Sequence, residues 1–338
     1  MRNLFGTADE LIEKVADGRP ASRESFAKNV DSLSGSPFER VLISGEPYVL
    51  KHLSRELDWI MRALGDGLDG RPPFVALMWR DGLLDALPDV IDPTIVGVSY
   101  DGGTGHCSVL MRDIGSHLVP SGGDRIPLAQ HRGFLDHMAA MHARFWEFEA
   151  RIGLLPPGGR YRALTPEMAA REAAAGYDDA VPRYVTTGWE ALRLAAPEAY
   201  ELTLSLATDP TPLASALAET PGTLVHGDWK YGNLGTGPGG RTILLDWAWP
   251  GRDGTCVDLA WYLAVNCDRL PESKEDATAA LRAALERAGV STADWWDRQL
   301  ELALVGGFVQ LGWSKTHDPA ELHWWTDQIV PVARDLLS

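Results

Sequence analysis

The stretch that decides the fold is Leu224–Asp246, which reads LVHGDWKYGNLGTGPGGRTILLD. It opens with two apolar residues, typical of a short strand, and runs into a His-Gly-Asp tripeptide that ends at Asp228. Asn233 follows five residues later, and a Gly/Pro-rich turn leads to a second apolar strand that delivers Asp246. The pattern predicts a β-hairpin unit that brings these polar side chains to one side.

This set of polar residues fits phosphoryl transfer to an alcohol, a reaction that depends mainly on positioning and electrostatics. Asp228 is the candidate base that accepts the proton of the hydroxyl group. Asn233 and Asp246 supply hard oxygen ligands, which suit Mg²⁺. Lys230 is the candidate that offsets negative charge on the phosphoryl group in transit. We therefore predict catalytic roles for Asp228 and Lys230 and metal-binding roles for Asn233 and Asp246.

Other interpretations of this stretch have less support. Residues 235–240 formally match GxGxxG, but Pro238 lies inside the match and a strand follows where a dinucleotide site needs a helix. The sequence contains no P-loop, zinc-protease or esterase motif. A metal-dependent hydrolase using His226 and Asp228 would lack a second histidine at ligand spacing.

Length and composition set further bounds. The 338 residues are too many for one ordinary core and favour two domains, and 45% hydrophobic with 23% charged residues is typical of a soluble globular protein. The net charge of −16 argues against nucleic acid or an anionic membrane as the main partner and is compatible with a cationic small substrate, although acidic surfaces more often serve solubility.

The compartment is predicted from cysteines and hydropathy. The three cysteines form no CxxC pair, which favours a reduced compartment. The N-terminal residues carry charges where a signal peptide is apolar, and no apolar run approaches the ~20 residues of a membrane helix. We therefore expect a cytoplasmic protein.

The N-terminal part of the chain is predicted to be rich in strands. Thr7 and Glu10 form a capping box that predicts a short opening helix. Lys51 lies in the third of five apolar runs. The five runs are residues 30–33, 38–43, 48–53, 94–99 and 107–111. The first three predict an antiparallel meander.

A helix is expected over residues 53–64, where apolar side chains recur at helical spacing. Glu56 falls at the margin of its buried face, which makes Glu56 the first candidate for an ion pair with Lys51. Asp58 and Asp66 are the alternatives.

Beyond Asp113 the composition turns helical. We therefore predict an α+β protein with a strand-rich part, residues 1–113, and a larger helical part, residues 114–338, that carries the small hairpin. The expected helices include residues 128–146, several between 150 and 220, 257–265, and several between 276 and 337.

Several segments, taken in order, resemble a known superfamily. HGDWKYGN resembles the catalytic loop of protein-kinase-like enzymes, in the form found in aminoglycoside phosphotransferases and choline kinases. DWAWPGRDGTCVDLAWYL resembles their metal-binding segment, YVLK the third-strand lysine, LMRDIG the hinge, and MAAMHARFW a helix with an L-H-x-x-F/W ending. The likeness runs discontinuously from about Phe38 to Tyr262.

The resemblance implies a two-lobed protein-kinase-like fold, with a small antiparallel-sheet N-lobe and a larger helical C-lobe, that uses ATP and Mg²⁺. It implies phosphate contact for Lys51, paired with Glu56, and a structural role for Asp258 behind the catalytic loop. Adenine would pair with the hinge, at Met111, Arg112 and Asp113. This chain departs from the pattern in three places: the metal motif lacks Phe-Gly after Asp246, the phosphate loop near residues 32–36 has one glycine, and the gap from Lys51 to Glu56 is short for the usual ion pair.

Residues and resemblance together predict transfer of the ATP γ-phosphate to a hydroxyl of a small aminoglycoside-, sugar- or amino-alcohol-like molecule. A choline-, ethanolamine- or homoserine-type kinase of the same fold is an alternative, and a catalytically silent kinase-like binding protein is another. Residues 150–220 and 270–338, expected to form the acceptor cleft, carry no motif, so the acceptor and the oligomeric state stay open.

Overall fold

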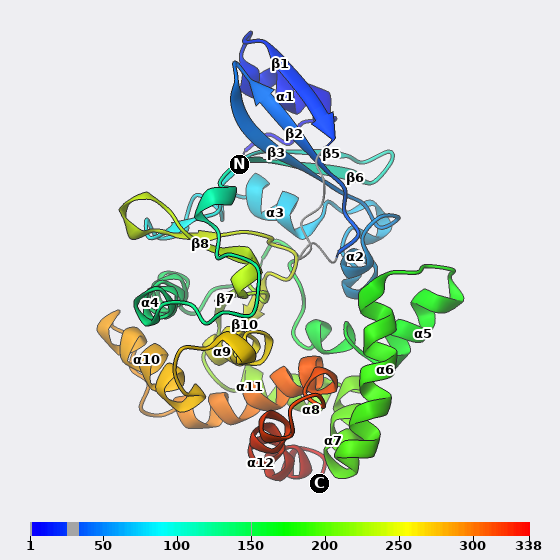
Figure 1. Ribbon diagram of the computed structural model, residues 1–338, viewed down its shortest axis with the longest axis vertical. Coiled ribbons are helices and arrows are strands. Elements are labelled where there is room, and N and C mark those ends of the chain that lie inside the picture. The colour runs from blue at the N-terminus through cyan, green and yellow to red at the C-terminus, as the bar shows by residue number, and fades with distance from the viewer. Residues whose placement is uncertain (1, 26–33, 150) are drawn as a thin grey trace. The chain divides into compact units, whose positions relative to one another are not determined.

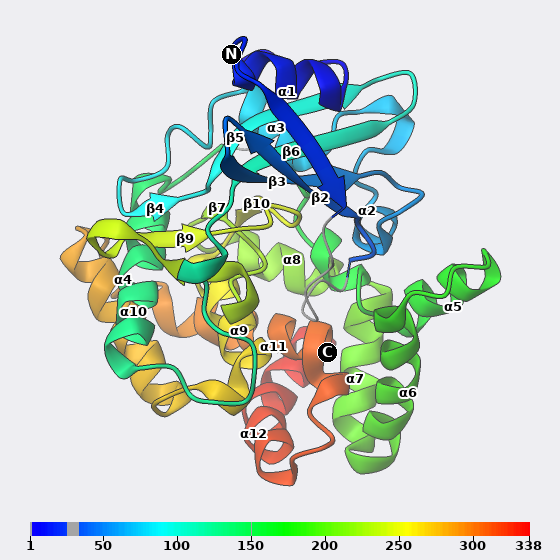
Figure 2. The ribbon, with the colours of Figure 1, turned by 45° about the horizontal axis from the view of Figure 1, so that its top comes forward.

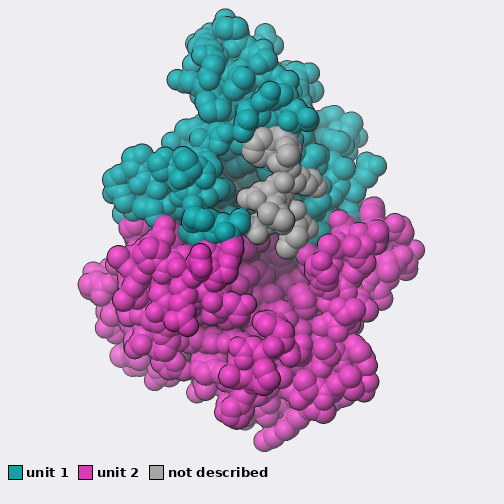
Figure 3. Space-filling model, viewed as in Figure 1, with its two compact units in different colours: residues 1–121, 152–154, 232–248 teal, residues 122–151, 155–231, 249–338 magenta. Residues whose placement is uncertain are grey.

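The computed structural model describes residues 2–25, 34–149 and 151–338. Contacts divide the chain into two compact units, coloured separately in Figure 3. Unit 1 comprises residues 1–121, 152–154 and 232–248, and unit 2 comprises residues 122–151, 155–231 and 249–338. The division is discontinuous, because the segment that contains Asn233 and Asp246 belongs to unit 1. The predicted single boundary after residue 113 does not describe this division.

Unit 1 is built on a five-stranded antiparallel sheet with the order β1-β2-β3-β6-β5 (Figure 1). The predicted strands at 38–43, 48–53, 94–99 and 107–111 are confirmed, with ends displaced by up to two residues, whereas the one at 30–33 lies outside the described residues. The edge strand β1 was not predicted, because every one of its residues is exposed and its pattern is not apolar. The strands are β1 (Ala21–Ser25), β2 (Phe38–Ile43), β3 (Glu46–Leu53), β5 (Ile95–Asp101) and β6 (His106–Arg112).

Helix α1 (Ala8–Ala16) covers one face of this sheet, against β5 and β6 (Figure 2). The predicted capping box is present: Glu10 N donates to Thr7 Oγ1 at 3.2 Å, and Thr7 N donates to the Glu10 carboxylate at 3.1 Å. The helix approaches β5 closely at Gly97, where a Cβ atom would overlap Leu11.

The two faces of the sheet have different surroundings. Leu50 and Leu110 point toward α1 and form a buried cluster with Leu11 and Ile12. Side chains alternate along a strand, so Lys51, the neighbour of Leu50 in β3, points to the opposite face. That opposite face carries the predicted nucleotide-binding residue.

The helix expected over 53–64 is shorter than predicted. Leu53 ends β3, and α2 (Trp59–Leu64) begins only after Asp58, whose carboxylate accepts from Ile60 N at 2.8 Å and from Met61 N at 3.4 Å. A further helix, α3 (Phe74–Arg80), was not predicted.

A second sheet of unit 1 has the order β4-β9-β8. Its strands β8 (Leu234–Thr236) and β9 (Thr242–Leu244) form an antiparallel hairpin, and β4 (Ile91–Asp92) pairs in parallel with β9. Asn233 and Asp246 flank this hairpin at its open end.

Unit 2 is mainly helical. A two-stranded sheet in this unit pairs β7 (Thr223–Val225) with β10 (Gly251–Asp253). The prediction that the strand before Asp228 belongs to the hairpin is therefore wrong: β7 takes β10 as its partner. The helices are α4 (Leu128–Arg144), α5 (Pro166–Ala174), α6 (Ala180–Ala195), α7 (Pro197–Thr208), α8 (Thr211–Ala218), α9 (Thr255–Val265), α10 (Lys274–Arg287), α11 (Trp296–Leu311) and α12 (Pro319–Leu336).

Helix α9 lies at the centre of unit 2. Residues 255–264 of this helix are all buried, as expected for a helix that is apolar on nearly all sides. Helix α11 packs against it, and Gly307 allows the approach, since a Cβ there would lie 3.2 Å from Ala260 Cβ. In the described parts of the chain, no helix combines the length and the apolar character required to cross a membrane.

Candidate functional site

A lysine and an acid predicted for nucleotide and metal binding are paired in unit 1. Lys51 is buried, with 7% of its surface exposed, and its Nζ lies 2.8 Å from Asp246 Oδ1. Asp246 follows β9 in a left-handed backbone conformation, with φ of 61°. A buried ammonium group needs a charged partner, and the acid at the end of β9 provides it.

The structure corrects the predicted partner of Lys51. Glu56 is exposed, in the turn between β3 and α2. Asp58 is buried instead, and Ser36 Oγ donates to its Oδ2 at 2.6 Å. Burial raises the pKa of Asp58, and the positive charge of Lys51 opposes that rise. Of the predicted alternatives, Asp58 is therefore the acid that shares the electrostatic environment of Lys51.

Asp66, the other alternative, is a buried carboxyl group that accepts a hydrogen bond from Phe74 N at 2.9 Å. Burial raises the pKa of Asp66 to about 7, although the backbone N–H groups of Phe74 and Gly67 oppose the rise. Its protonation therefore changes near neutral pH.

This carboxyl group should make the stability of the protein fall as pH rises. The folded state binds the Asp66 proton up to about pH 7, whereas an unfolded chain releases it near the usual pKa of 3.8. The contribution is therefore complete below about pH 3.8 and lost as pH rises through about 7, with an upper size of about 4 kcal/mol. Urea unfolding of wild type and Asp66→Asn across this window should show a difference in unfolding free energy that changes with pH. A difference that stays constant would contradict the assignment.

The predicted hinge residues lie at the end of strand β6, with Asp113 directly after it. Arg112 N donates to Thr94 O at 3.1 Å, and Asp113 N donates to Pro47 O at 3.3 Å. Both N–H groups are thus used within unit 1, which limits how Arg112 and Asp113 can pair with adenine. Met111 lies between β3 and β5 in the sheet. Adenine binding at this segment stays a prediction.

The two predicted metal ligands are joined by the β8–β9 hairpin. Leu245 N donates to Asn233 O at 2.9 Å, which closes the open end of the hairpin next to Asp246. One amide and one carboxylate fit Mg²⁺, because this ion usually keeps several waters and takes phosphate oxygens for the rest of its shell. Over residues 2–25, 34–149 and 151–338, no cluster of three or more His, Cys, Asp or Glu side chains is arranged for a metal.

The predicted base lies in unit 2 with both carboxylate oxygens engaged. Asp228 has 2% of its surface exposed. Its Oδ1 accepts from Trp261 Nε1 at 3.0 Å, and its Oδ2 lies 3.0 Å from Lys230 Nζ. The two residues predicted to be catalytic are therefore an ion pair. Trp261 was not predicted.

The backbone before Asp228 is held by Asp258. Its Oδ2 accepts from His226 N at 2.9 Å, and its Oδ1 accepts from Gly227 N at 2.6 Å. Burial raises the pKa of Asp258, but the hydrogen bond and charge of His142, 3.0 Å away, the charge of His226 and the hydrogen bond from Gly227 N together outweigh burial and lower it. The structural role that the resemblance implied for Asp258 is present in these contacts.

Gly227 is required by the same loop. Its φ of 79° is left-handed, and a Cβ atom there would lie 2.5 Å from Trp249 O. Any side chain at this position would displace the backbone that leads to Asp228.

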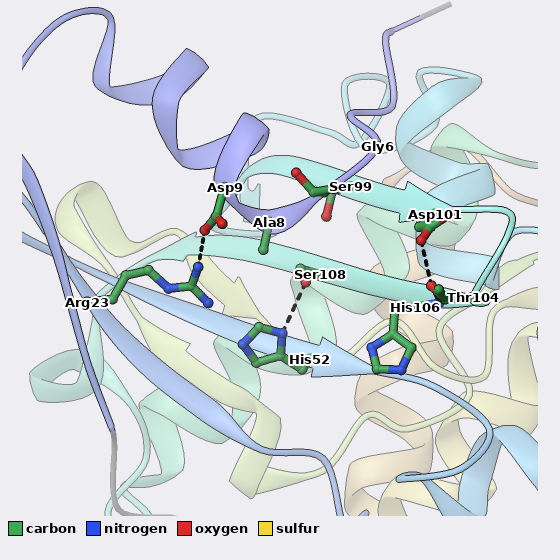
Figure 4. Close-up of a pocket in the computed structure, with 11 residues that line it drawn as sticks. Gly6, Ala8, Asp9, Arg23, His52, Ser99, Asp101, Thr104, His106 and Ser108 are labelled. Carbon is green, nitrogen blue, oxygen red and sulfur yellow. Dashed lines mark hydrogen bonds and ion pairs between the residues drawn. The ribbon is translucent and has the colours of Figure 1, made fainter.

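A pocket in unit 1 is lined by none of the site residues named above (Figure 4). It is lined by the first turn of α1, by Arg23, and by polar side chains of β3, β5 and β6 that include His52, Ser99 and Ser108. His52 and Lys51 are neighbours in a strand and point to opposite faces of the sheet. The pocket is therefore on the face away from Lys51.

These features define a class of fold, the two-lobed protein-kinase-like fold. The chain is similar to the solved structure of an aminoglycoside phosphotransferase from Streptomyces rimosus in complex with ADP and streptomycin: the TM-score is 0.52 at 16% identity, over 89% of this chain and 96% of that one. It is also similar to a choline kinase from Streptococcus pneumoniae, with a TM-score of 0.49 at 14% identity over 96% and 97% of the two chains. The predicted fold class is confirmed. The sequence matches no protein-family model and no curated protein.

Proposed function

We propose that the protein transfers the γ-phosphate of ATP to a hydroxyl group of a small molecule, with Mg²⁺ as the metal. The observation that carries this proposal is the ion pair between Lys51 and Asp246, which joins residues 195 positions apart. A kinase-like fold with a phosphate-binding lysine next to a metal-binding acid is equipped for phosphoryl transfer.

Unit 1 supplies the residues that handle the nucleotide. Lys51 contacts the α- and β-phosphates, and Asp58 adds negative charge near the lysine. Asn233 and Asp246 hold the metal. When bound, Mg²⁺ offsets the charge of the phosphate oxygens.

Unit 2 supplies the base. The acceptor oxygen forms a bond to the γ-phosphorus, and the bond from that phosphorus to the bridging oxygen of ADP breaks. Asp228 accepts the proton of the acceptor hydroxyl group. Lys230 compensates negative charge beside this carboxylate, from which its Nζ is 3.0 Å away.

The acceptor is proposed to be a hydroxylated, amino-bearing molecule. The similar structure from Streptomyces rimosus is a complex with ADP and streptomycin. The net charge of −16 favours a cationic acceptor over an anionic one. A cytoplasmic location is also part of the proposal and depends on the sequence alone.

Binding of ATP should depend on the metal and on Asp246. With ligand at about 100 times its dissociation constant, the folded state gains about 2.7 kcal/mol, which raises Tm by several degrees. Differential scanning fluorimetry with ATP, with and without Mg²⁺, should show that shift for wild type. The part of the Tm shift that requires Mg²⁺ should be lost in the Asp246→Asn variant.

The matched control is Asp85→Asn, which removes a carboxylate of unit 1 that is paired with Arg2 at the surface. This variant should keep the full Mg²⁺-dependent shift. If wild type shows no metal-dependent stabilisation by ATP, the kinase proposal fails and a catalytically silent protein of the same fold is favoured. A panel of aminoglycosides, sugars and amino alcohols, read by mass gain of one phosphate, then identifies the acceptor.

A further inference from the structure

One face of helix α9 holds the loop that carries the proposed base. Asp258 binds the loop backbone before Asp228, and Tyr262 OH donates to Tyr231 OH at 3.1 Å after it. Asn266, which ends the helix, accepts from Tyr231 N at 2.9 Å. Trp261 lies between these contacts, one helical turn after Asp258. The helix therefore fixes the loop at several points, and Trp261 contacts its functional side chain.

The contact between Trp261 and Asp228 is well defined. Trp261 Nε1 donates to Asp228 Oδ1 at 3.0 Å, and 6% of the tryptophan surface is exposed. The indole packs on Trp249, with ring centroids 5.7 Å apart, which restricts its rotation. An indole N–H is a donor only, so the bond persists whether Asp228 is ionised or protonated.

The other oxygen of the carboxylate is in a different situation. Oδ2 faces Lys230, whose side chain has 28% of its surface exposed and ends a flexible stem. Lys230 can follow a changing charge, whereas the buried indole cannot. The two oxygens of Asp228 are therefore not equivalent: one is fixed by the fold, and the other lies beside a cation that can move.

We propose that Trp261 is a positioning residue for Asp228, which fixes Oδ1 and orients Oδ2 to take the proton of the acceptor hydroxyl group. This inference depends on the proposed function. It assigns no contact with substrate to Trp261. A donor to an ionised carboxylate also favours the charged form, so removal of the indole N–H should raise the pKa of Asp228.

The test replaces Trp261 by phenylalanine, which removes the donor and keeps an aromatic ring. Hydrogen bonds to charged groups are worth about 1.5–3 kcal/mol, so we expect kcat to fall by about 10- to 100-fold. The acid limb of the kcat–pH profile should move to higher pH. KM for ATP should stay unchanged, because the nucleotide residues lie elsewhere in the chain.

The matched control is Trp79→Phe in α3. Trp79 is buried to a similar degree, with 7% of its surface exposed, and its Nε1 donates to Asn3 O at 3.1 Å. This variant loses the same kind of bond without contact to Asp228. It should keep the wild-type kcat and pH profile.

Other groups near the loop could also change a pH profile, and they are the same in wild type and in Trp261→Phe. They are Lys230 and His226 on the loop, Asp258 on α9, His142 on α4, and the buried pair Arg160 and Asp253. A shift seen only on loss of the indole N–H is therefore assigned to the bond from Trp261.

A second measurement separates this inference from the proposed function. Carboxyl ¹³C NMR titration follows the ionisation of Asp228 without turnover, with the signal assigned by its loss in Asp228→Asn. We expect the Asp228 titration to move to higher pH in Trp261→Phe and to stay in place in Trp79→Phe. If the titration does not move, the inference is wrong even in an active kinase. If the titration moves in a protein that transfers no phosphate, the contact between Trp261 and Asp228 is established. The kinase proposal then fails, and the positioning role fails with it.

A variant that keeps the shape of tryptophan serves as a control for misfolding caused by the smaller phenylalanine side chain. Benzothienylalanine at position 261 replaces the indole N–H by sulfur and preserves the two-ring side chain. The same rise in the Asp228 titration and the same fall in kcat are expected. Wild-type behaviour of this variant would overturn the proposal.

Discussion

Asp228→Asn is expected to lower kcat by a factor of about 10²–10⁴, which is the usual contribution of a general base. The amide keeps the shape of the side chain, and its oxygen can still accept from Trp261 Nε1. Its nitrogen cannot take the proton of the acceptor, and it faces the ammonium group of Lys230, which is also a donor. The fall should therefore appear in kcat, measured with the acceptor that the mass-based screen identifies.

Nucleotide binding supplies the internal control for this variant. Lys51, Asn233 and Asp246 are unchanged, so the Mg²⁺-dependent Tm shift with ATP should match wild type. Full turnover by Asp228→Asn would show that another group takes the proton. Loss of both turnover and ATP binding would instead indicate that the substitution disturbs the loop.

The feature predicted best is the one that depends on local spacing, whereas the metal-binding roles of Asn233 and Asp246 stay predictions. Asn233 and Asp246 flank a hairpin of two three-residue strands, and a single backbone bond, Leu245 N to Asn233 O, fixes their relation. The Gly/Pro turn and the apolar run before Asp246 predicted the turn and the second strand of this hairpin, whereas its first strand, β8, was not predicted.

Which acid between β3 and α2 lies buried near Lys51 was harder to predict, because the strand period and the helix period overlap at Leu53. This residue fits both the end of β3 and the start of a helix, and counting it in the helix placed Glu56 near the buried face. The cap decides the outcome: Asp58 binds the first N–H groups of α2, so the helix starts after it. An aspartate directly before an apolar run was the signal that favoured Asp58.

Trp261 could not be predicted, because its bond to Asp228 joins residues 33 positions apart through the packing of α9. Only the spacing of one helical turn from Asp258 pointed to it. Likewise, β1 forms by backbone pairing with β2, and its exposed polar residues leave no pattern of alternation.

The loop around Asp228 should also lose its support when Asp258 is replaced by alanine. Asp258 is fully buried and accepts hydrogen bonds from His226 N and Gly227 N. Its Oδ2 also lies 3.0 Å from His142 Nε2. The alanine variant leaves all three groups without this acceptor, which should cost about 3–5 kcal/mol. We expect Tm to fall on the order of 10 °C.

The pH dependence of this effect has a defined sign. Because the pKa of Asp258 is lowered on folding, its contribution is present above the usual value of 3.8 and is lost as pH falls through the lowered one. The difference in unfolding free energy between wild type and Asp258→Ala should therefore shrink in acid. Asp318→Ala is the matched control, since its partly exposed carboxylate also accepts from two backbone N–H groups, those of Ala320 and Glu321. Loss of that cap should cost only about 0.5–2 kcal/mol. Equal losses of unfolding free energy in the two variants would show that burial and His142 add nothing to the contribution of Asp258. Asp258 would then act as an ordinary cap of the loop.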